Sequence, residues 1–462
     1  MNYDFLSAID EKEALLNDTA DYLWENPETA FTEYRSAAKL TQVLRDEGFR
    51  VEEGLAGIKT AFSGSFGSGR PVIGILGEFD ALSGLGQVAG VTEHTPNGQP
   101  CGQGCGHNLL GVGALGAAFA VKRWLEQTGA PGTVIYFGCP GEEGGSGKAF
   151  MARDGVFDCL DAALTWHPAD VTEVRTTLSL ANYQIRFEFD GLAAHAGEHP
   201  HLGRSALDAV ELMNVGVNFL REHIPTSYRI HYAITDAGGF SPNVVQSHSE
   251  VLYLIRAPRN EQVKELYERV CDIAKGAALM TGTKEHHVFI KACSNVILNT
   301  EIQRMLHEKM EEIAVPEPTD EDVAFAKALT EAALTEIPDA DPAHPIHWEL
   351  KPYDASEKQK HGSTDVGDVS WVCPTAQIHT STIARGTPGH SWQVVSQGKL
   401  PLAHRMTNYA GKIMAAGAVE LMQNAELLER AKQEFRARVG EAGYIPPIPK
   451  DVRPVSMEAL HK

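Results

Sequence analysis

The sequence has little positive charge, few cysteines and no long apolar run. Its 462 residues carry 40 Lys and Arg against 61 Asp and Glu, which gives a formal net charge of −21. A chain this acidic lacks the basic face that binds nucleic-acid phosphates, so we expect no nucleic-acid partner. A small anionic substrate remains compatible, because a few cations inside a cleft outweigh the distant charge.

Signals for membrane insertion and secretion are also missing. The longest apolar stretch, Leu109 to Val121, is too short to span a bilayer. The segment from Met1 to Glu13 is acidic and lacks the basic and then apolar order of a signal peptide. Seven cysteines spread through a long chain do not indicate a disulfide framework. We therefore expect no membrane partner and a cytoplasmic protein, whose reduced thiols are available as metal ligands.

The first part of the chain alternates strand and helix patterns. The predicted strands are Pro71 to Glu78, Thr133 to Pro140 and Ala162 to Trp166, and the predicted helices are Asp4 to Trp24, Glu33 to Glu47, Leu109 to Thr128 and Gly147 to Arg153. A long loop, Leu82 to Gly106, follows the first strand, and loops of this length are usually functional. This β-α-β-α-β order predicts a parallel sheet with helices on its faces.

The middle of the chain has the order β-α-β-β-α-β, which is that of a ferredoxin-like unit. Its predicted elements are Tyr183 to Asp190, Arg204 to His223, Arg229 to Thr235, Glu250 to Ala257, Glu261 to Met280 and Glu285 to Ala292. A complete unit of this size can fold by itself. We therefore place an inserted domain at residues 184–295, between the two parts of a first domain, residues 1–183 and 296–462.

The last part of the chain returns to helices. We predict them at Thr300 to Ile313, Asp320 to Leu334, Leu402 to Asn424 and Glu426 to Val439, with one strand around Ala376. Pro338 to Pro352, rich in Pro, Asp and His, is predicted to be a surface excursion. The predicted fold class is α/β: a mixed, largely parallel sheet flanked by helices, with an inserted ferredoxin-like α+β domain.

Potential metal ligands follow the predicted strands. They are Asp80 after the first strand, Cys105 and His107 at the end of the long loop, Glu142 and Glu143 after the second strand, and His167 after the third. The carboxyl ends of parallel strands meet at the ligand-binding edge of such a sheet. Thiolate, imidazole and carboxylate donors gathered there predict a divalent metal site, with more than one ion.

Each of these residues also has a structural explanation. Cys105 and His107 could be a buried thiol beside a capping histidine, and Glu142 and Glu143 could begin a solvated helix. The two carboxylates stand between glycines, however, and adjacent residues at a turn point in different directions. One can then bind metal while the other accepts a proton from water. A closed zinc site with Cys101 is the weaker alternative, because Cys-x2-Cys spacing is absent.

Several motifs occur together in an order that resembles a known family. They are Cys105 to Asn108, Pro140 to Gly145, Trp166 to Pro168 and Ala193 to Ala196. The sequence resembles the metallo-aminoacylase/carboxypeptidase family, and within it the amidohydrolase branch that holds auxin-conjugate hydrolases and p-aminobenzoyl-glutamate hydrolase subunits. The likeness covers essentially the whole chain and is strongest to the B-type subunits, in Gly102 to Leu110, Gly138 to Phe150, Pro200 to Ala209 and Ser363 to Trp371.

This resemblance implies a role for each matching residue. Metal ligands would be Cys105, His107, Glu143, His167 and His390, with Glu142 as general base and Asp80 as an acidic residue beside the site. The metals would be two divalent ions, Mn or Zn. Asn108 stands where many relatives have Asp, a change that could weaken the orientation of His107 or alter the metal preference.

The resemblance also assigns substrate contacts to the inserted domain. His195 would help to stabilise the oxyanion, and Asn243 and Arg256 would hold a substrate carboxylate. Taken alone, Arg256 at the end of an apolar strand needs a carboxylate partner, and a protein acid is then the more frequent one. Alone, His195 could cap a turn, and Asn243 after a proline could simply form one.

The implied activity is hydrolysis of an N-acyl or aroyl amino acid with a free α-carboxylate. We expect p-aminobenzoyl-glutamate as the substrate, with indole-3-acetyl-aspartate and other acyl amino acids or dipeptides as alternatives. A different class of function is a partner-dependent or non-catalytic subunit. The expected partners are a small anionic substrate and either a second copy, bound through the inserted lid domain, or a homologous subunit.

Overall fold

The computed structural model describes residues 2–332, 340–456 and 459. The chain divides into two compact units. The first unit consists of Met1–Thr177, Ile297–Lys358 and Val369–Ile445, and the second of Leu178–Val296, Gln359–Asp368 and Pro446–Lys462. Among the described residues, no helix has both the length and the apolar character that crossing a bilayer requires. None of the seven cysteines forms a disulfide bond.

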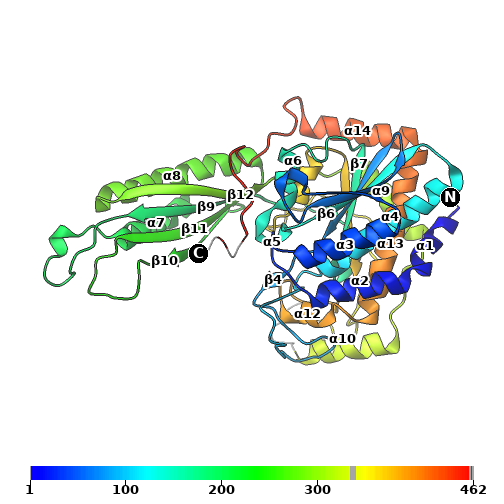
Figure 1. The fold of residues 1–462 in the computed structure, drawn as a ribbon, viewed down its shortest axis with the longest axis horizontal. Coiled ribbons are helices and arrows are strands. Elements are labelled where there is room, and N and C mark those ends of the chain that lie inside the picture. Colours follow the sequence, from blue (N-terminus) through cyan, green and yellow to red (C-terminus); the bar gives the residue numbers. More distant parts are fainter. Residues whose placement is uncertain (1, 333–339, 457–458, 460–462) are drawn as a thin grey trace. The chain divides into compact units, whose positions relative to one another are not determined.

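The first unit is built on an eight-stranded sheet in the order β1-β2-β6-β3-β7-β14-β8-β13 (Figure 1). Its strands are β1 (Arg50–Glu53), β2 (Phe62–Ser68), β3 (Val72–Glu78), β6 (Gly132–Cys139), β7 (Ala162–Ala169), β8 (Val171–Val174), β13 (His347–Leu350) and β14 (Thr375–Ser381). The four central strands, β6, β3, β7 and β14, are mutually parallel. β1, β2 and β8 pair antiparallel with their inner neighbours, so the predicted mixed, largely parallel sheet is confirmed.

The core of the first unit lies between the sheet and two long helices, α4 (His107–Thr128) and α13 (Pro401–Gln423). Alternate residues of the central strands, such as Ile75, Trp166 and Ile378, are fully buried in this core. Small residues on α4 let the helix approach the sheet closely. A Cβ atom on Gly113 would lie 2.6 Å from the indole nitrogen of Trp166.

Further helices complete the first unit. They are α1 (Ser7–Glu11), α2 (Glu13–Glu25), α3 (Tyr34–Asp46), α5 (Glu142–Gly145), α6 (Gly147–Arg153), α9 (Thr300–Glu312), α10 (Asp320–Ala332), α12 (Trp392–Gln397) and α14 (Ala425–Val439). Two short strands, β4 (Leu82–Ser83) and β5 (Cys101–Gly102), pair across the long loop. Helix α11 (Val366–Ser370) spans the boundary between the two units.

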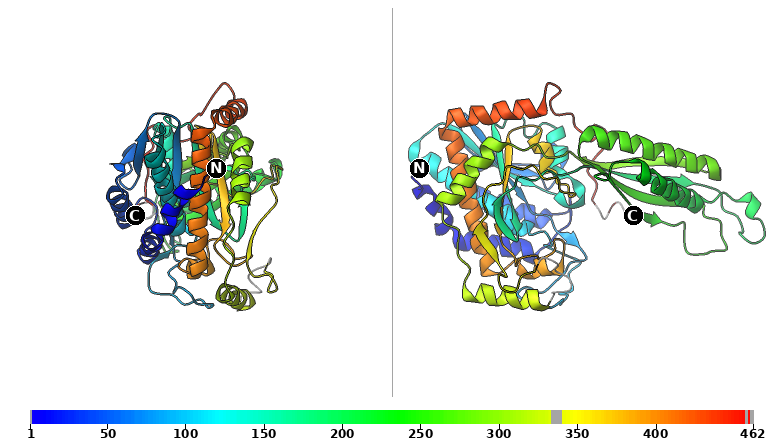
Figure 2. Two further views of the ribbon diagram at one scale, coloured as in Figure 1. Left: turned by 90° about the vertical axis from the view of Figure 1, so that its right-hand side faces the viewer. Right: turned by 180° about the vertical axis from the view of Figure 1, so that it is seen from behind.

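The second unit has the predicted β-α-β-β-α-β order. Its elements are β9 (Ala181–Asp190), α7 (Ala206–Leu220), β10 (Arg229–Asp236), β11 (His248–Ala257), α8 (Asn260–Thr281) and β12 (Lys284–Cys293). The antiparallel sheet has the order β10-β11-β9-β12, and the two helices pack on one of its faces (Figure 2). That face carries buried aromatic residues, including Phe187 and Tyr253.

The structure differs from the sequence-based expectations in a few elements. The single helix predicted over Asp4 to Trp24 is a 3-10 turn and two helices, α1 and α2. Strand β2 is rich in Gly and Ser and was not predicted. Gly64 suits this strand because a Cβ there would lie 2.9 Å from the methyl groups of Leu44. The expected excursion at Pro338 to Pro352 instead contributes the edge strand β13, although residues 338 and 339 lie outside the described residues.

The close approach of α4 to Trp166 predicts a difference between two glycines of one helix. Gly113→Ala should lower the melting temperature by several degrees, because overpacking against a rigid indole costs about 1–3 kcal/mol. Gly116→Ala is the matched control, since its Cβ would meet a Leu16 methyl group at 3.3 Å. Differential scanning calorimetry of both variants tests this, and equal melting temperatures would contradict the proposed packing constraint.

Candidate metal centre

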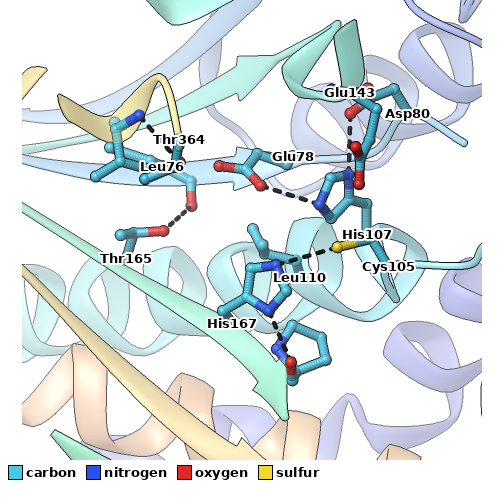
Figure 3. Close-up of polar contacts among 12 residues, drawn as sticks. Leu76, Glu78, Asp80, Cys105, His107, Leu110, Glu143, Thr165, His167 and Thr364 are labelled. Atoms are coloured by element: carbon cyan, nitrogen blue, oxygen red, sulfur yellow. Dashed lines mark hydrogen bonds and ion pairs between the residues drawn. The ribbon is translucent and has the colours of Figure 1, made fainter. Parts of the chain in front are cut away.

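The candidate site lies at the carboxyl ends of the central parallel strands. Glu78 ends β3, the Glu142–Glu143 pair follows β6, and His167 lies near the end of β7. His107 is the first residue of α4. Figure 3 shows the side chains of Glu78, His107, Glu143 and His167 converging from separate elements. The predicted meeting of the three strand ends is therefore present in the structure.

The turn after β6 gives its two carboxylates different directions. Gly141, Gly144 and Ser146 all have left-handed backbones, with φ of 68°, 81° and 57°. Glu143 leaves the helical region, with φ −76° and ψ 91°. A Cβ atom on Gly147 would lie 1.9 Å from the carbonyl oxygen of Pro140. The glycines are thus required by the turn, which separates the side chain of Glu142 from that of Glu143.

Asp80 connects two of the candidate ligands. Its Oδ1 atom lies 3.0 Å from His107 Nδ1, and its Oδ2 atom accepts a hydrogen bond of 2.8 Å from the backbone N–H of Glu143. With its proton on Nδ1, the imidazole presents Nε2 to a metal. Asn108 does not take part, because its side-chain amide donates to the carbonyls of Ala20 and Gly398. The side chain of Asn108 therefore makes no direct contact through which it could orient His107.

The candidate ligands form three groups in which one atom from each residue lies within 4.8 Å of the others. The groups are Cys105 with His107 and His167, Cys105 with Glu143 and His390, and Glu78 with His107 and Glu142. Cys105 belongs to two groups, and its sulfur lies 3.4 Å from His167 Nε2. His390 Nε2 lies 2.9 Å from Glu143 Oε1. The structure thus brings together all five residues proposed as ligands, with Asp80 and Glu142 beside them.

The protonation states of this cluster suit a divalent cation. Burial and Glu143 raise the pKa of the Cys105 thiol, but His167 and His107 outweigh them and lower it to about 6. Burial likewise raises the pKa of Glu143, yet hydrogen bonding to His390 and the charge of His107 lower it to about 2. Both groups are therefore anionic at neutral pH. A bound cation would replace the protons that these anions hold on the neighbouring imidazoles.

One buried nitrogen also fits a metal. His107 Nε2 is enclosed and makes no hydrogen bond, although it lies 3.2 Å from Glu78 Oε2. A buried polar atom in this condition is unfavourable unless something else binds it. Together with the thiolate and the carboxylates, it forms a donor set of the kind that Zn and related ions take. The residues present therefore fit a metal group.

Sequence reasoning missed a buried ion pair behind the cluster. The carboxylate of Glu78 is 1% exposed, and its Oε1 atom lies 2.8 Å from the Lys148 ammonium, which is fully buried. Burial raises the pKa of Glu78, but Lys148, His107 and His167 together lower it. The available signals were a lysine directly before the apolar residues Ala149 to Met151 and a glutamate at the end of the apolar strand β3.

A second missed residue, His379, lies beside His167. The two residues are paired in register on the parallel strands β14 and β7, with ring centroids 6.2 Å apart. Burial, together with the positive charges of Arg175 and His167, lowers the pKa of His379 to about 4, so its imidazole is neutral at neutral pH. Its position at the carboxyl end of the strand around Ala376 was the signal that could have identified it.

The three predicted substrate contacts belong to the second unit and fall into two places. His195 forms a β-bridge with Val244, and the N–H of Ala196 donates to the carbonyl of Asn243, so these two turns are neighbours. Arg256 lies near the other end of β11, eight residues beyond His248, or roughly 26 Å along the strand. Within one chain, Arg256 is therefore not brought together with His195 and Asn243.

The guanidinium of Arg256 has no acidic partner. It donates to Ser363 Oγ at 3.0 Å and lies 3.5 Å from the carbonyl of His361, and its buried Nε atom makes no hydrogen bond. Among the described residues, no carboxylate forms an ion pair with it. Pairing with a protein acid, the alternative left open by the sequence, is not what the structure contains.

Comparisons with known proteins agree on one family. Residues 74–346 match the model of peptidase family M20/M25/M40. The chain is 47% identical to the B subunit of p-aminobenzoyl-glutamate hydrolase from Escherichia coli, over 98% of each chain. It is 27% identical to the Xaa-Arg dipeptidase of Mus musculus, over 94% of this chain and 91% of that one. A dinuclear metal-binding M20 peptidase of Bacillus subtilis has the same fold, with a TM-score of 0.56 at 16% identity, covering 90% and 99% of the two chains.

The sharing of Cys105 between two donor groups predicts which substitution removes most metal. Cys105→Ala should lose most of its bound Mn or Zn, because both groups lose their thiolate. Cys101→Ala is the matched control, since that buried thiol donates to the carbonyl of Pro27 and belongs to none of the three groups. Elemental analysis of the purified variants measures the effect, and equal metal contents would rule out the shared ligand.

Proposed function

Because the chain belongs to peptidase family M20/M25/M40, we propose that it is a metal-dependent amidohydrolase that cleaves p-aminobenzoyl-glutamate into p-aminobenzoate and glutamate. The observation that carries this proposal is the pair of donor groups that share Cys105. The choice of substrate rests on 47% identity to the B subunit of p-aminobenzoyl-glutamate hydrolase over nearly the whole of both chains. We expect the enzyme to act in the cytoplasm.

We assign two divalent ions, Mn or Zn, to the donor groups. Cys105, His107 and His167 would hold one ion, and Cys105, Glu143 and His390 the other. When bound, such ions polarise the amide carbonyl and lower the pKa of a water molecule. Asp80 keeps the imidazole of His107 turned toward its ion through the 3.0 Å contact with Nδ1.

Glu142 is the proposed general base. Its carboxylate comes from the same turn as Glu143 but points separately, because the backbone of Glu143 is not helical. It would accept a proton from the attacking water and deliver it to the nitrogen of the leaving glutamate. This transfer lets the amine leave in its neutral form.

The second unit supplies the remaining contacts in this proposal. Asn243 and Arg256 hold the α-carboxylate, and His195 donates to the oxyanion of the tetrahedral intermediate. The unpaired guanidinium of Arg256 supports its role, since a planar fork of N–H groups matches a carboxylate.

The distance along β11 supports a homodimer. His195 and Asn243 lie at one end of the second unit and Arg256 at the other, so one copy cannot place all three on a single small substrate. A second copy could supply the missing pair.

A candidate surface for this contact lies on the same unit. Helix α7 exposes Leu212, Val215 and Phe219 at helical spacing, and the edge strand β10 exposes Tyr232 and Ile234. Exposed apolar side chains beside an unpaired strand edge are typical of a surface that pairs with another chain.

A partner-dependent or non-catalytic subunit is the alternative of another class. It is favoured by one observation, the subunit name carried by the 47% identical relative. The complete donor set argues against an inactive site. Assays of the chain by itself, and then with a homologous subunit, distinguish the two. Indole-3-acetyl-aspartate and other acyl amino acids belong in the same substrate panel.

The proposed reaction predicts that replacing the general base Glu142 lowers kcat. The purified chain with Mn or Zn should hydrolyse p-aminobenzoyl-glutamate, and Glu142→Gln should reduce kcat by at least about 100-fold, because general-base catalysis contributes that much. Metal content should stay nearly unchanged. Unaltered kcat in the variant would refute the mechanism, and turnover that appears only with a partner subunit would favour the alternative class.

The proposed dimer surface gives a second prediction. Phe219→Glu places a charge on a side chain that is 70% exposed in the single chain and should therefore convert a dimer to monomers without unfolding the protein. Loss of activity with retained metal is the expected result, because His195 and Asn243 would no longer reach a site. Analytical ultracentrifugation measures the association state. A fully active monomer would contradict the proposed sharing of residues.

A further inference from the structure

An arginine that no role above uses lies on the same sheet face as His167, one of the proposed metal ligands. Arg175 directly follows β8, and its N–H donates to the carbonyl of Gln377 on β14 at 2.9 Å. In register, β14 places Gln377 opposite Thr165 and His379 opposite His167 on β7. Residues two apart on a strand share a face. Arg175 is thus two strands from His167, a backbone separation of roughly 12 Å from strand spacing and rise.

The guanidinium of Arg175 has an amide partner and no acidic one. Its Nη1 atom donates to Gln377 Oε1 at 2.5 Å. Among the described residues, no carboxylate forms an ion pair with it. Burial lowers its pKa, and Glu142 and Glu78 oppose that effect, so the cation lies within the field of the proposed base without a direct contact. A guanidinium carries five N–H groups in a planar fork, which leaves donors for a ligand.

Arg175 is not needed to balance the negative charge of Glu78, because Lys148 already does so. The carboxylate of Glu78 already has a cation at 2.8 Å, the fully buried ammonium of Lys148. Arg175 is therefore a second, partly buried cation near the same carboxylates, without a carboxylate of its own. A substrate could therefore supply the negative group that binds Arg175 directly.

We infer that Arg175 binds a second carboxylate on the substrate, the γ-carboxylate of the leaving glutamate, and so selects acidic amino acids as leaving groups. This inference rests on the proposed function. In that function Arg256 holds the α-carboxylate, which leaves the side-chain carboxylate of glutamate without a partner. Bidentate binding by a planar guanidinium suits that group, and Gln377 holds the fork in place.

A paired-substrate experiment tests the assignment. p-Aminobenzoyl-glutamate and p-aminobenzoyl-glutamine differ only in the charge of the side-chain terminus. The wild-type protein should prefer the glutamate substrate by about 10- to 100-fold in kcat/KM, as expected for hydrogen bonds to a charged group. Arg175→Met should lose that factor for the glutamate substrate, mainly through KM, and change the glutamine substrate less than about 3-fold. Arg175→Lys should restore part of the preference.

Lys148→Met is the matched control, because it removes a buried cation near the same carboxylates that has a protein partner. It should change both substrates by the same factor. If Arg175→Met also reduces both substrates equally, Arg175 only adjusts the charge around Glu142, and the inference is wrong. Metal content and melting temperature of each variant show whether the fold and the donor groups are retained.

A binding measurement separates failure of this inference from failure of the proposed function. Calorimetric titration of the metal-loaded protein with L-glutamate and with L-glutamine requires no turnover. The wild-type protein should bind glutamate more tightly, and Arg175→Met should remove the difference. If the wild type hydrolyses neither aroyl substrate but prefers glutamate through Arg175, only the proposed reaction fails. Equal binding of the two amino acids by the wild type overturns the inference.

Discussion

The carboxylate of Asp80 is the contact on which the site depends. One oxygen faces His107 Nδ1 and the other accepts the N–H of Glu143, so a single side chain after β3 aligns the start of α4 with the turn after β6. Both elements carry ligands from different parts of the sequence. Without this bridge, the imidazole could rotate and the turn could shift independently. The donor groups require that neither happens, because metal geometry tolerates little displacement.

Charge balance is the second constraint on the site. A thiolate and several carboxylates lie close together in a buried site. Lys148 pairs with Glu78, and histidine imidazoles contact Cys105 and Glu143. The net charge of −21 therefore says little about the site itself. Local cations determine how strongly an anionic substrate binds, since buried charges interact more strongly than distant surface charges.

Much of the fold could be predicted because its patterns are long and periodic. The central strands, the long helices and the order of the second unit agree with the structure. The elements that were not predicted have physical explanations. Strand β2 is built of small residues that pack under Leu44, so it resembles a loop, and β13 is a four-residue edge strand inside a Pro-rich segment. The first helix is interrupted at Lys12, which no local pattern marked.

The sequence by itself determined the ligand types and their places after strand ends, since metal chemistry restricts residue identity and parallel strands share one ligand-binding edge. Only the tertiary structure decided which partners these residues have. The contact of Asp80 with His107, the pair of Glu78 with Lys148 and the open guanidinium of Arg175 all depend on strand order and register. Those properties are set by packing between distant segments, which local sequence patterns do not encode.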